Sequence, residues 1–331
     1  MKVLFVSSGN RKSGLNPIIQ LQAKSLEEKG VTIDHYLIFG KGIKGYFNNI
    51  FKLKKHLKHN SYDLIHAHFG FSCIVAQLAK GNLPLLVTLM GTDVLGHKNL
   101  HGGMSLKNKL ILWVNHFFGI YVYGTAIVMN KKMKDMFWKR KGPTYILSNG
   151  VDTKLFQEVP KQEALNHLGW DPNFDHFLFM ANPERPEKNY PLAFEAIEIV
   201  KNKGLPVQLH TVFQEKSVNL KYYYSAATAL LIPSFHEGSP NVVKEAFACN
   251  CPIVFTDVGD VSETTKDLKG CFMAPYDPEG FSKEIFKSIE FGKKNGRIKG
   301  KERIKYLDFD KEVVAEKIKK IYMQLSGREL S

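Results

Sequence analysis

Short runs of apolar residues alternate with longer amphipathic stretches along the whole chain. The alternation breaks once, near residues 149–156, and then restarts. Continuous apolar runs of this length predict strands that are buried on both faces, as in a parallel sheet covered by helices. The runs that we interpret as strands are 2–8, 31–38, 62–69, 84–91, 125–130, 143–149, 176–182, 206–212, 229–234, 251–257 and 270–275.

This order of elements predicts an α/β protein made of two doubly wound parallel-sheet domains. We place the first domain at residues 1–152 and the second at 153–308. A last amphipathic helix, in residues 309–331 with Asp310 as a candidate N-cap, can cross back to the first domain. Ligands bind at the carboxyl ends of the strands in such sheets, so two sheets that face each other predict one shared site.

The segment Leu110–Met129 contains no charged residue and passes a simple count for a membrane span. Its second part is rich in β-branched and aromatic residues. We therefore expect a buried helix that runs into a buried strand. Four polar or small residues interrupt the segment: Asn115, His116, Gly119 and Gly124.

The N-terminal apolar run is too short for a signal peptide. The chain has four cysteines, which are too few for a disulfide framework and indicate a reducing compartment. The sequence thus predicts a cytoplasmic protein. Cys249 and Cys251 have no matching second pair at zinc spacing, so we expect no metal site there.

The positive charge is concentrated in the first half. Residues 1–150 hold 21 Lys and Arg against 6 Asp and Glu, whereas the rest of the chain is close to neutral. The first half is therefore expected to meet an anionic partner. Basic residues interleaved with aromatic ones in a nucleic-acid-binding module are not found, so we expect no nucleic acid as partner.

Six lysines and several apolar residues share the segment Lys41–Asn60. Two interpretations stay open. The segment can be an amphipathic helix that rests on the anionic inner leaflet of the cytoplasmic membrane. It can also be a surface helix that packs on its own sheet through Phe47, Ile50 and Phe51.

The stretch "HEGSPNVVKEA" places two glutamates, Glu237 and Glu245, eight residues apart around a turn. A strand precedes it, and a helix is expected to follow, with Ser239 as its cap and Pro240 in its first turn. The glutamates are then too far apart to act on one atom, but they can hold the two ends of an extended ligand. The free N–H groups between them can bind an anion. A ligand with hydroxyl groups at both ends and phosphate in the middle is a nucleotide sugar. Alternatively, both glutamates are ordinary surface residues.

This stretch resembles the E-x7-E element of the retaining glycosyltransferases of family 4, which have the GT-B fold of two facing Rossmann-like domains. Five other stretches resemble that family in its order, so that the resemblance covers nearly the whole chain. They are "DLIHAHFG" (63–70), "LVTLMGTDV" (86–94), "LSNGVDTKLF" (147–156), "PERPEKN" (183–189) and "CPIVFTDVGDVSE" (251–263).

The resemblance implies a role for each matching residue. Glu245 would bind the ribose hydroxyls of the donor, Glu237 the hydroxyls of the transferred sugar, and Lys188 the diphosphate. Arg185 would supply a guanidinium to the diphosphate, because the usual arginine position is Pro183 here. The other implied donor-binding residues are Gly14, Gly238, Ser239, Pro240, Asn241 and Val242.

On the acceptor side the sequence departs from the family. Met90 stands where many members have a histidine, and a methionine cannot donate a strong hydrogen bond. Either this subgroup does without the contact, or activity is impaired, or one of the histidines His66, His68 and His97 compensates, with His68 the first choice. Asp93 would contact the acceptor or cap a helix.

The function that we expect is the retaining transfer of a hexose-type sugar from a UDP- or GDP-sugar to a glycan or lipid-linked acceptor. The setting would be bacterial-type surface polysaccharide synthesis. No cofactor and no metal are expected, and the acidic pair Asp308 and Asp310 is interpreted as part of a helix cap. The alternatives are a catalytically impaired nucleotide-sugar-binding protein and another GT-B enzyme such as a sugar-nucleotide epimerase.

Overall fold

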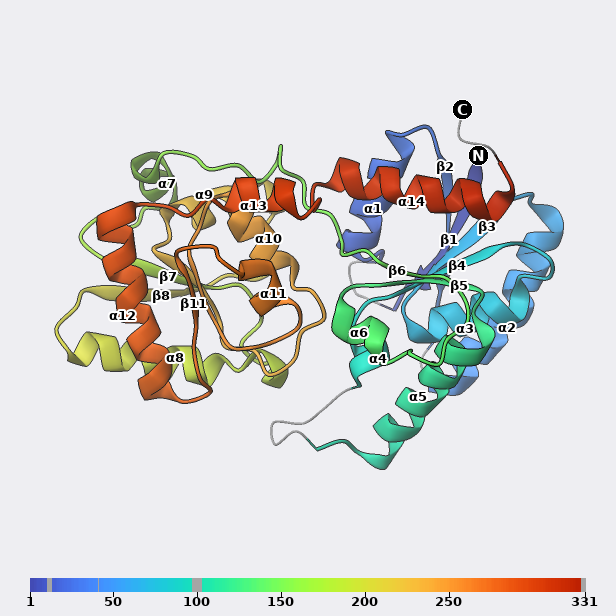
Figure 1. Ribbon diagram of the computed structural model, residues 1–331, viewed down its shortest axis with the longest axis horizontal. Helices are drawn as coiled ribbons and strands as arrows, with labels where there is room; N and C mark the ends of the chain where they lie inside the picture. The colour runs from blue at the N-terminus through green and yellow to red at the C-terminus, as the bar shows by residue number, and fades with distance from the viewer. Residues whose placement is uncertain (11–13, 41, 97–102, 329–331) are drawn as a thin grey trace. The chain divides into compact units, whose positions relative to one another are not determined.

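A computed structural model of the protein describes residues 1–10, 14–40, 42–96 and 103–328 (Figure 1). The chain forms two compact units. Unit 1 is built mainly from Met1–Gly150 and the C-terminal segment that starts at Lys311, and unit 2 from Val151–Asp310. The expected domain ends at residues 152 and 308 lie two residues from these boundaries.

Unit 1 contains a parallel sheet of six strands in the order β2-β1-β3-β4-β5-β6. Its strands are β1 (Lys2–Ser8), β2 (Thr32–Ile38), β3 (Leu64–His68), β4 (Leu85–Leu89), β5 (Thr125–Val128) and β6 (Thr144–Ile146). Its helices are α1 (Pro17–Glu27), α2 (Gly42–His59), α3 (Gly70–Ala79), α4 (Thr92–Leu95), α5 (Leu106–Phe117), the π-helical turn η1 (Phe118–Val122), α6 (Lys131–Asp135) and α14 (Lys311–Ser326). In Figure 1, α1 and α14 lie on one side of this sheet and α2, α3 and α5 on the other.

Unit 2 contains a parallel sheet of five strands in the order β11-β10-β9-β7-β8. Its strands are β7 (Asp175–Phe179), β8 (Val207–Thr211), β9 (Ala229–Ile232), β10 (Ile253–Phe255) and β11 (Cys271–Met273). Its helices are α7 (Lys161–Leu168), the 3-10 turn η2 (Pro186–Lys188), α8 (Tyr190–Asn202), α9 (Ser217–Ala226), α10 (Asn241–Ala248), α11 (Val261–Thr265), α12 (Pro278–Asn295) and α13 (Gly300–Tyr306). The predicted fold class, two α/β units each with a parallel sheet, is confirmed.

Helix α14 belongs to unit 1, although the chain reaches it from unit 2. Val314, Ile318 and Ile321 are buried in the core of unit 1. The hydroxyl of Tyr322 lies 2.6 Å from Nδ1 of His66, whose Nε2 lies 2.7 Å from Oγ1 of Thr88. A buried polar chain therefore joins α14 to strands β3 and β4.

The expected burial of Leu110–Met129 is only partly right. Strand β5 is buried, but α5 exposes the side chains of Leu110, Trp113 and Phe117. The reason is that only one side of α5 faces the core, where Val114 packs and Asn115 is buried. Among the described residues, no helix combines the length and the apolar character that crossing a bilayer requires.

Helix α2 occupies residues 42–59 of the basic segment 41–60. Ile50 and Leu53 are buried in the core, whereas Phe47 and Phe51 are exposed and pack edge to face on each other at 5.6 Å. The interpretation in which Phe47, Ile50 and Phe51 all pack on the sheet is therefore right for Ile50 only. Residue 41 lies outside the described residues.

Candidate active site

Unit 2 reverses its strand order between β7 and β9, because the chain leaves β7 toward β8 and returns to form β9 on the other side of β7. Ligands of open parallel sheets bind at this point, beyond the carboxyl ends of the two strands. The loop after β7 carries Arg185 and Lys188, and the loop after β9 carries Glu237. Three of the sequence-predicted residues thus lie on the two loops that flank the reversal.

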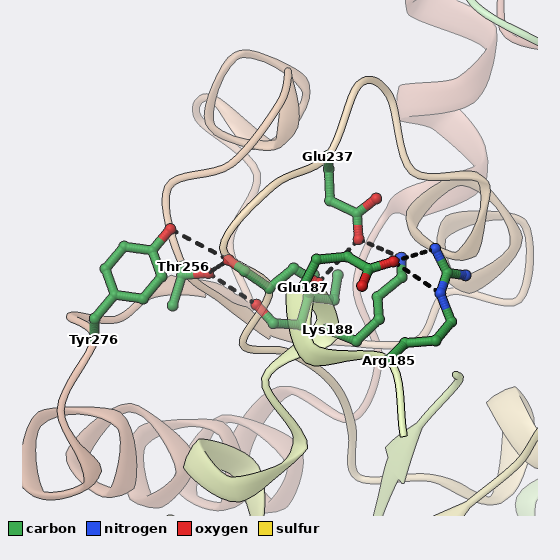
Figure 2. A network of polar contacts seen from close by, with 8 residues as sticks. Arg185, Glu187, Lys188, Glu237, Thr256 and Tyr276 are labelled. Carbon is green, nitrogen blue, oxygen red and sulfur yellow. Dashed lines mark hydrogen bonds and ion pairs between the residues drawn. The ribbon is translucent and has the colours of Figure 1, made fainter. Parts of the chain in front are cut away.

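Lys188 and Glu237 form an ion pair between these loops, with Nζ of Lys188 2.5 Å from Oε1 of Glu237 (Figure 2). Both side chains are mostly buried, at 17% and 12% exposed. The same Oε1 accepts a hydrogen bond of 2.9 Å from the hydroxyl of Ser234. Because a lysine ammonium has three donors, the pair can also hold a further anion or hydroxyl.

Two hydroxyl side chains from other segments of unit 2 hold the loop at Ser234. The hydroxyl groups of Thr256 and Tyr276 donate to the carbonyl oxygen of Ser234, at 2.7 and 3.2 Å (Figure 2). The ring of Tyr276 also stacks on that of Phe235. Thr256 lies in the stretch 251–263 quoted above, but no role was assigned to it from the sequence, and Phe235 and Tyr276 lie outside the quoted stretches.

The two loops are joined by their backbones as well. The amide of Phe235 donates to the carbonyl of Glu187 at 2.9 Å, and the Asn189 side chain donates to the carbonyl of Pro233 at 3.1 Å. Arg185 is held by Glu187, whose Oε1 accepts from Nε at 2.8 Å and from Nη2 at 2.5 Å. Figure 2 shows this guanidinium next to Lys188, so two cations gather on the same loop.

Helix α10 begins at Asn241, with Pro240 in the cap position and no side-chain hydrogen bond capping its end. The expected cap at Ser239 is therefore wrong. The Ser239 side chain instead hydrogen-bonds to the carboxylate of Asp260. The amide of Val243 donates to the carbonyl of Pro240 at 3.2 Å, and the N-terminal end of α10, at Asn241 and Val242, is of the kind that binds anionic ligands.

Gly259 supports the loop that leads into α10. Its φ of +58° lies in the left-handed region, and a Cβ there would approach the carbonyl oxygen of Gly238 to 2.6 Å. A side chain is thus excluded twice, by backbone conformation and by space. The loop of Gly259 and Asp260 fixes the Gly238–Ser239 segment from one side.

Glu245 lies on α10 and is partly buried, with Oε2 accepting a 2.7 Å hydrogen bond from the buried Tyr224 hydroxyl. Burial raises the pKa of Glu245, while Tyr224 and the charge of Lys244 lower it. Lys244 is itself only 2% exposed, and burial lowers its pKa to about 8 against the charges of Asp260 and Glu245. Val242 and Glu245 lie three residues apart, on the same side of α10.

Unit 1 has its own reversal point, between β1 and β3. Gly14, in the loop after β1, has a φ of +73° and open space around its Cα. Phe69 directly follows β3 with a φ of 75°, which is unusual for a non-glycine residue. Strained backbone of this kind clusters at functional sites, and no pattern in the sequence predicts it at Phe69.

The histidines of β3 are buried. His68 has no exposed surface; its Nε2 lies 2.7 Å from Oε1 of Gln22 on α1, and burial lowers its pKa to about 3. His66 is held between Tyr322 and Thr88, and burial lowers its pKa well below the usual value. Neither side chain presents a surface to an acceptor in this structure, and His97 lies outside the described residues.

Asp93 closes the turn after β4. Its carboxylate accepts hydrogen bonds from the backbone amides of Gly91, Met90 and Gly70, at 2.8 to 3.1 Å. Burial raises the pKa of Asp93, and these amides lower it. The Asp93 carboxylate is therefore engaged with the backbone of its own loops, including Gly70 at the start of α3, and the partly exposed Met90 stands three residues before it in the sequence.

Two family models match the chain. Residues 175–304 match the model described as "Glycosyl transferases group 1". Residues 20–155 match the model described as "Glycosyltransferase Family 4". The two matches fall on the two units, and together they include every candidate residue of both reversal points except Gly14.

Curated relatives are distant but similar over long stretches. A putative teichuronic acid biosynthesis glycosyltransferase of Bacillus subtilis is 27% identical over 60% of this chain and 54% of its own length. The chain thus spans about half of that relative. A capsular polysaccharide biosynthesis glycosyltransferase of Staphylococcus aureus is 24% identical over 90% of this chain and 85% of its own length.

Solved structures with the same fold cover nearly the entire chain. The sucrose-phosphate synthase of Thermosynechococcus elongatus has a TM-score of 0.81 at 18% identity, covering 98% of this chain and 99% of that one. The Anabaena protein HepE, solved in complex with UDP, has a TM-score of 0.73 at 16% identity, covering 98% and 100%. These neighbours are glycosyltransferases of the GT-B fold, which unites two such α/β units.

Proposed function

Because the chain belongs to the glycosyltransferases of the GT-B fold, we propose that it transfers a sugar from a nucleotide-diphosphate donor to an acceptor. The observation that carries the proposal is the Lys188–Glu237 ion pair at the strand reversal of unit 2. The donor would be a UDP- or GDP-sugar, in keeping with HepE, which was solved with UDP and with UDP-glucose. The acceptor would be a glycan or lipid-linked precursor of a surface polysaccharide, as the names of two relatives suggest.

Breaking the bond between sugar and diphosphate develops negative charge on the diphosphate and positive charge on the sugar ring. The negative charge on the diphosphate would be stabilised by Lys188, by Arg185 and by the N-terminal end of α10. Fixed positive groups aimed at developing charge lower the barrier without reorganising during the reaction. The site would thus act mainly by electrostatic stabilisation of the leaving group.

Glu237 would bind hydroxyls of the transferred sugar through the carboxylate that Lys188 and Ser234 orient. Glu245, eight residues further on, would accept hydrogen bonds from the ribose hydroxyls. Asn241 contributes a further acceptor, since its Oδ1 is buried and has no hydrogen-bond partner in the described part of the chain. These groups together match the alternating hydroxyl, phosphate and hydroxyl character of a nucleotide sugar.

We propose retention of configuration at the anomeric carbon. The acceptor oxygen would attack on the face from which the diphosphate departs, forming the new bond to the anomeric carbon as the old one breaks. The acceptor proton would pass to the departing diphosphate oxygen. Glu237 already accepts from Lys188 and Ser234, so its proposed task is to orient the sugar rather than to remove this proton.

A donor screen tests the proposal. Purified protein is incubated with UDP-, GDP- and ADP-sugars, and thermal stability and released nucleotide diphosphate are measured, since a ligand that binds the folded state raises its stability. We expect one donor class to stabilise the protein and to be turned over, and an NMR spectrum of the product to show the retained anomer. Stabilisation without turnover, with acceptor present, would favour the impaired binding protein that Met90 suggests.

A further inference from the structure

Helix α5 and the π turn that follows it expose a row of large apolar side chains. Their positions are four, three, four and four residues apart, which places them along one side of the helix. Their exposed fractions range from 44% to 84%. We call this row the α5 stripe; it consists of Leu106, Leu110, Trp113, Phe117 and Tyr121.

The α5 stripe is not needed to hold the helix on its sheet. The opposite side of the segment does that, with Val114 and Phe118 packed on the core and Asn115 buried. The rings of the stripe contact one another instead, Trp113 with Phe117 at 5.9 Å and Phe117 with Tyr121 at 5.6 Å. A contiguous apolar row left on the surface marks an interaction site.

The segment after α6 extends the stripe. Trp138 is 78% exposed, and the amino group of Lys139 lies over its ring. Arg140 fixes this segment to the end of η1, because its guanidinium donates to the carbonyl oxygens of Gly119 and Tyr123 at 2.5 and 2.7 Å. Trp138 is therefore held close to the end of the α5 stripe.

The charge around these residues indicates the chemistry of the partner. Between residues 103 and 146 the chain has eight basic residues and a single acidic one, Asp135. The basic residues are Lys107, Lys109, Lys131, Lys132, Lys134, Lys139, Arg140 and Lys141. A second copy of this surface would bring like charges together, and protein interfaces are depleted in lysine.

We propose that the α5 stripe and Trp138 form the surface by which the protein binds an anionic lipid bilayer. Tryptophan and tyrosine prefer the depth of the lipid headgroups, leucine and phenylalanine reach the acyl chains, and lysines beside them meet anionic headgroups. The long lysine side chains can keep their charge in the headgroup layer while their stems lie on apolar surface.

Helix α2 is the other element with this character, through Phe47, Phe51 and its lysines. It lies on the same side of the sheet of unit 1 as α5 (Figure 1). Among the side chains of α2 that the structure describes, two large apolar ones are exposed, against five in the α5 stripe. The sequence pointed to α2 as the membrane contact. In the proposal α5 makes the main contact and α2 a secondary one.

The three tryptophans make a direct test possible. Trp113 and Trp138 lie on the proposed surface, while Trp170 belongs to unit 2, where it stacks on His210 at 3.6 Å. The protein is mixed with vesicles of phosphatidylcholine alone or with phosphatidylglycerol, each with and without brominated acyl chains, which quench nearby tryptophans. We expect quenching with the anionic vesicles only, less at high salt, and its loss in the Trp113→Phe, Trp138→Phe double variant.

Sedimentation with the same vesicles compares matched surface variants. The pair Trp113→Ser and Phe117→Ser should weaken binding by at least about tenfold, because two apolar anchors are lost. The pair Phe47→Ser and Phe51→Ser should weaken it less, and Tyr306→Ser, an exposed tyrosine of unit 2, should not change it. Circular dichroism checks that each variant is folded.

Three outcomes would overturn the inference: no binding to anionic vesicles, binding that only the α2 pair weakens, or a dimer in light scattering that only the α5 pair dissociates. The inference rests on the proposed function at one point: a lipid-linked acceptor would be the reason for the enzyme to bind a bilayer. Vesicle binding is measured without donor, so a protein that binds vesicles but turns over no donor would refute the proposed function alone.

Discussion

Nζ of Lys188 lies 2.5 Å from Oε1 of Glu237, and this pair joins the two loops at the strand reversal of unit 2. A cation and a carboxylate held together in a mostly buried place resist movement when a ligand arrives. Preorganisation of this kind is what electrostatic catalysis requires.

Replacing Lys188 by alanine should lower kcat/KM by about 10² to 10³, the usual effect of removing one group that stabilises developing charge. The control is Lys201→Ala, which removes an exposed lysine that pairs with Glu198 on α8. Steady-state rates of nucleotide diphosphate release measure both. A Lys188→Ala variant as active as the control would contradict the assigned role.

Substituting Gly259 by alanine tests the support of the Gly238 loop. The new Cβ would both occupy a left-handed conformation and approach the Gly238 carbonyl to 2.6 Å. The KM for the donor should rise by at least about tenfold, because small displacements of positioning groups are costly. Gly204→Ala shares the positive φ, at +84°, but meets no atom within 4 Å, so it should lose stability without losing donor affinity.

Tyr224→Phe tests the carboxylate of Glu245. In the wild type, the hydrogen bond from the Tyr224 hydroxyl lowers the pKa of Glu245. The variant lacks this hydroxyl, so the pKa of Glu245 should rise further. Protonated Glu245 accepts ribose hydroxyls poorly, and the acid limb of kcat/KM for the donor should therefore shift to higher pH. A pH profile beside that of Tyr306→Phe, an exposed control, measures the shift, and superimposable acid limbs would argue against this role.

The fold could be predicted because the strands of covered parallel sheets are continuous apolar runs. Strands such as β3 and β9 are buried along their whole length, and their sequences show it directly. The character of α5 could not be predicted in the same way. An apolar stretch such as Leu110–Phe117 does not reveal which of its sides another element covers, and here only the side of Val114 is covered.

The candidate site was predictable where a motif carries it and not where tertiary contacts do. Lys188 and Glu237 stand out in their stretches, but their pairing depends on β7 and β9 being neighbours. Tyr224 reaches Glu245 from a different helix, and no local pattern marks it. His68 ends a strand at the ligand side of the sheet, yet its side chain is buried and contacts Gln22 of α1.

The contact between Tyr322 and His66 should be important for stability. Tyr322→Phe leaves a buried imidazole nitrogen without its partner, which typically costs about 1–3 kcal/mol. Tyr145→Phe is a matched control, because Tyr145 also reaches α14, through a 3.0 Å hydrogen bond to Gln324, but in an exposed place. Urea unfolding should show the larger loss for Tyr322→Phe, and equal losses would mean that the buried contact contributes little.

Chelation of divalent metals should leave turnover intact. The charge that a metal would neutralise on the diphosphate is met in the proposed mechanism by Lys188, by Arg185 and by the uncapped start of α10, whose dipole favours anions. Rates with excess EDTA should therefore equal those with added Mg²⁺ in the wild type. Added Mg²⁺ can restore part of the rate only in Lys188→Ala, where a cation is missing. A wild-type enzyme that stops in EDTA and recovers with Mg²⁺ would assign the leaving-group charge to a metal instead of the lysine.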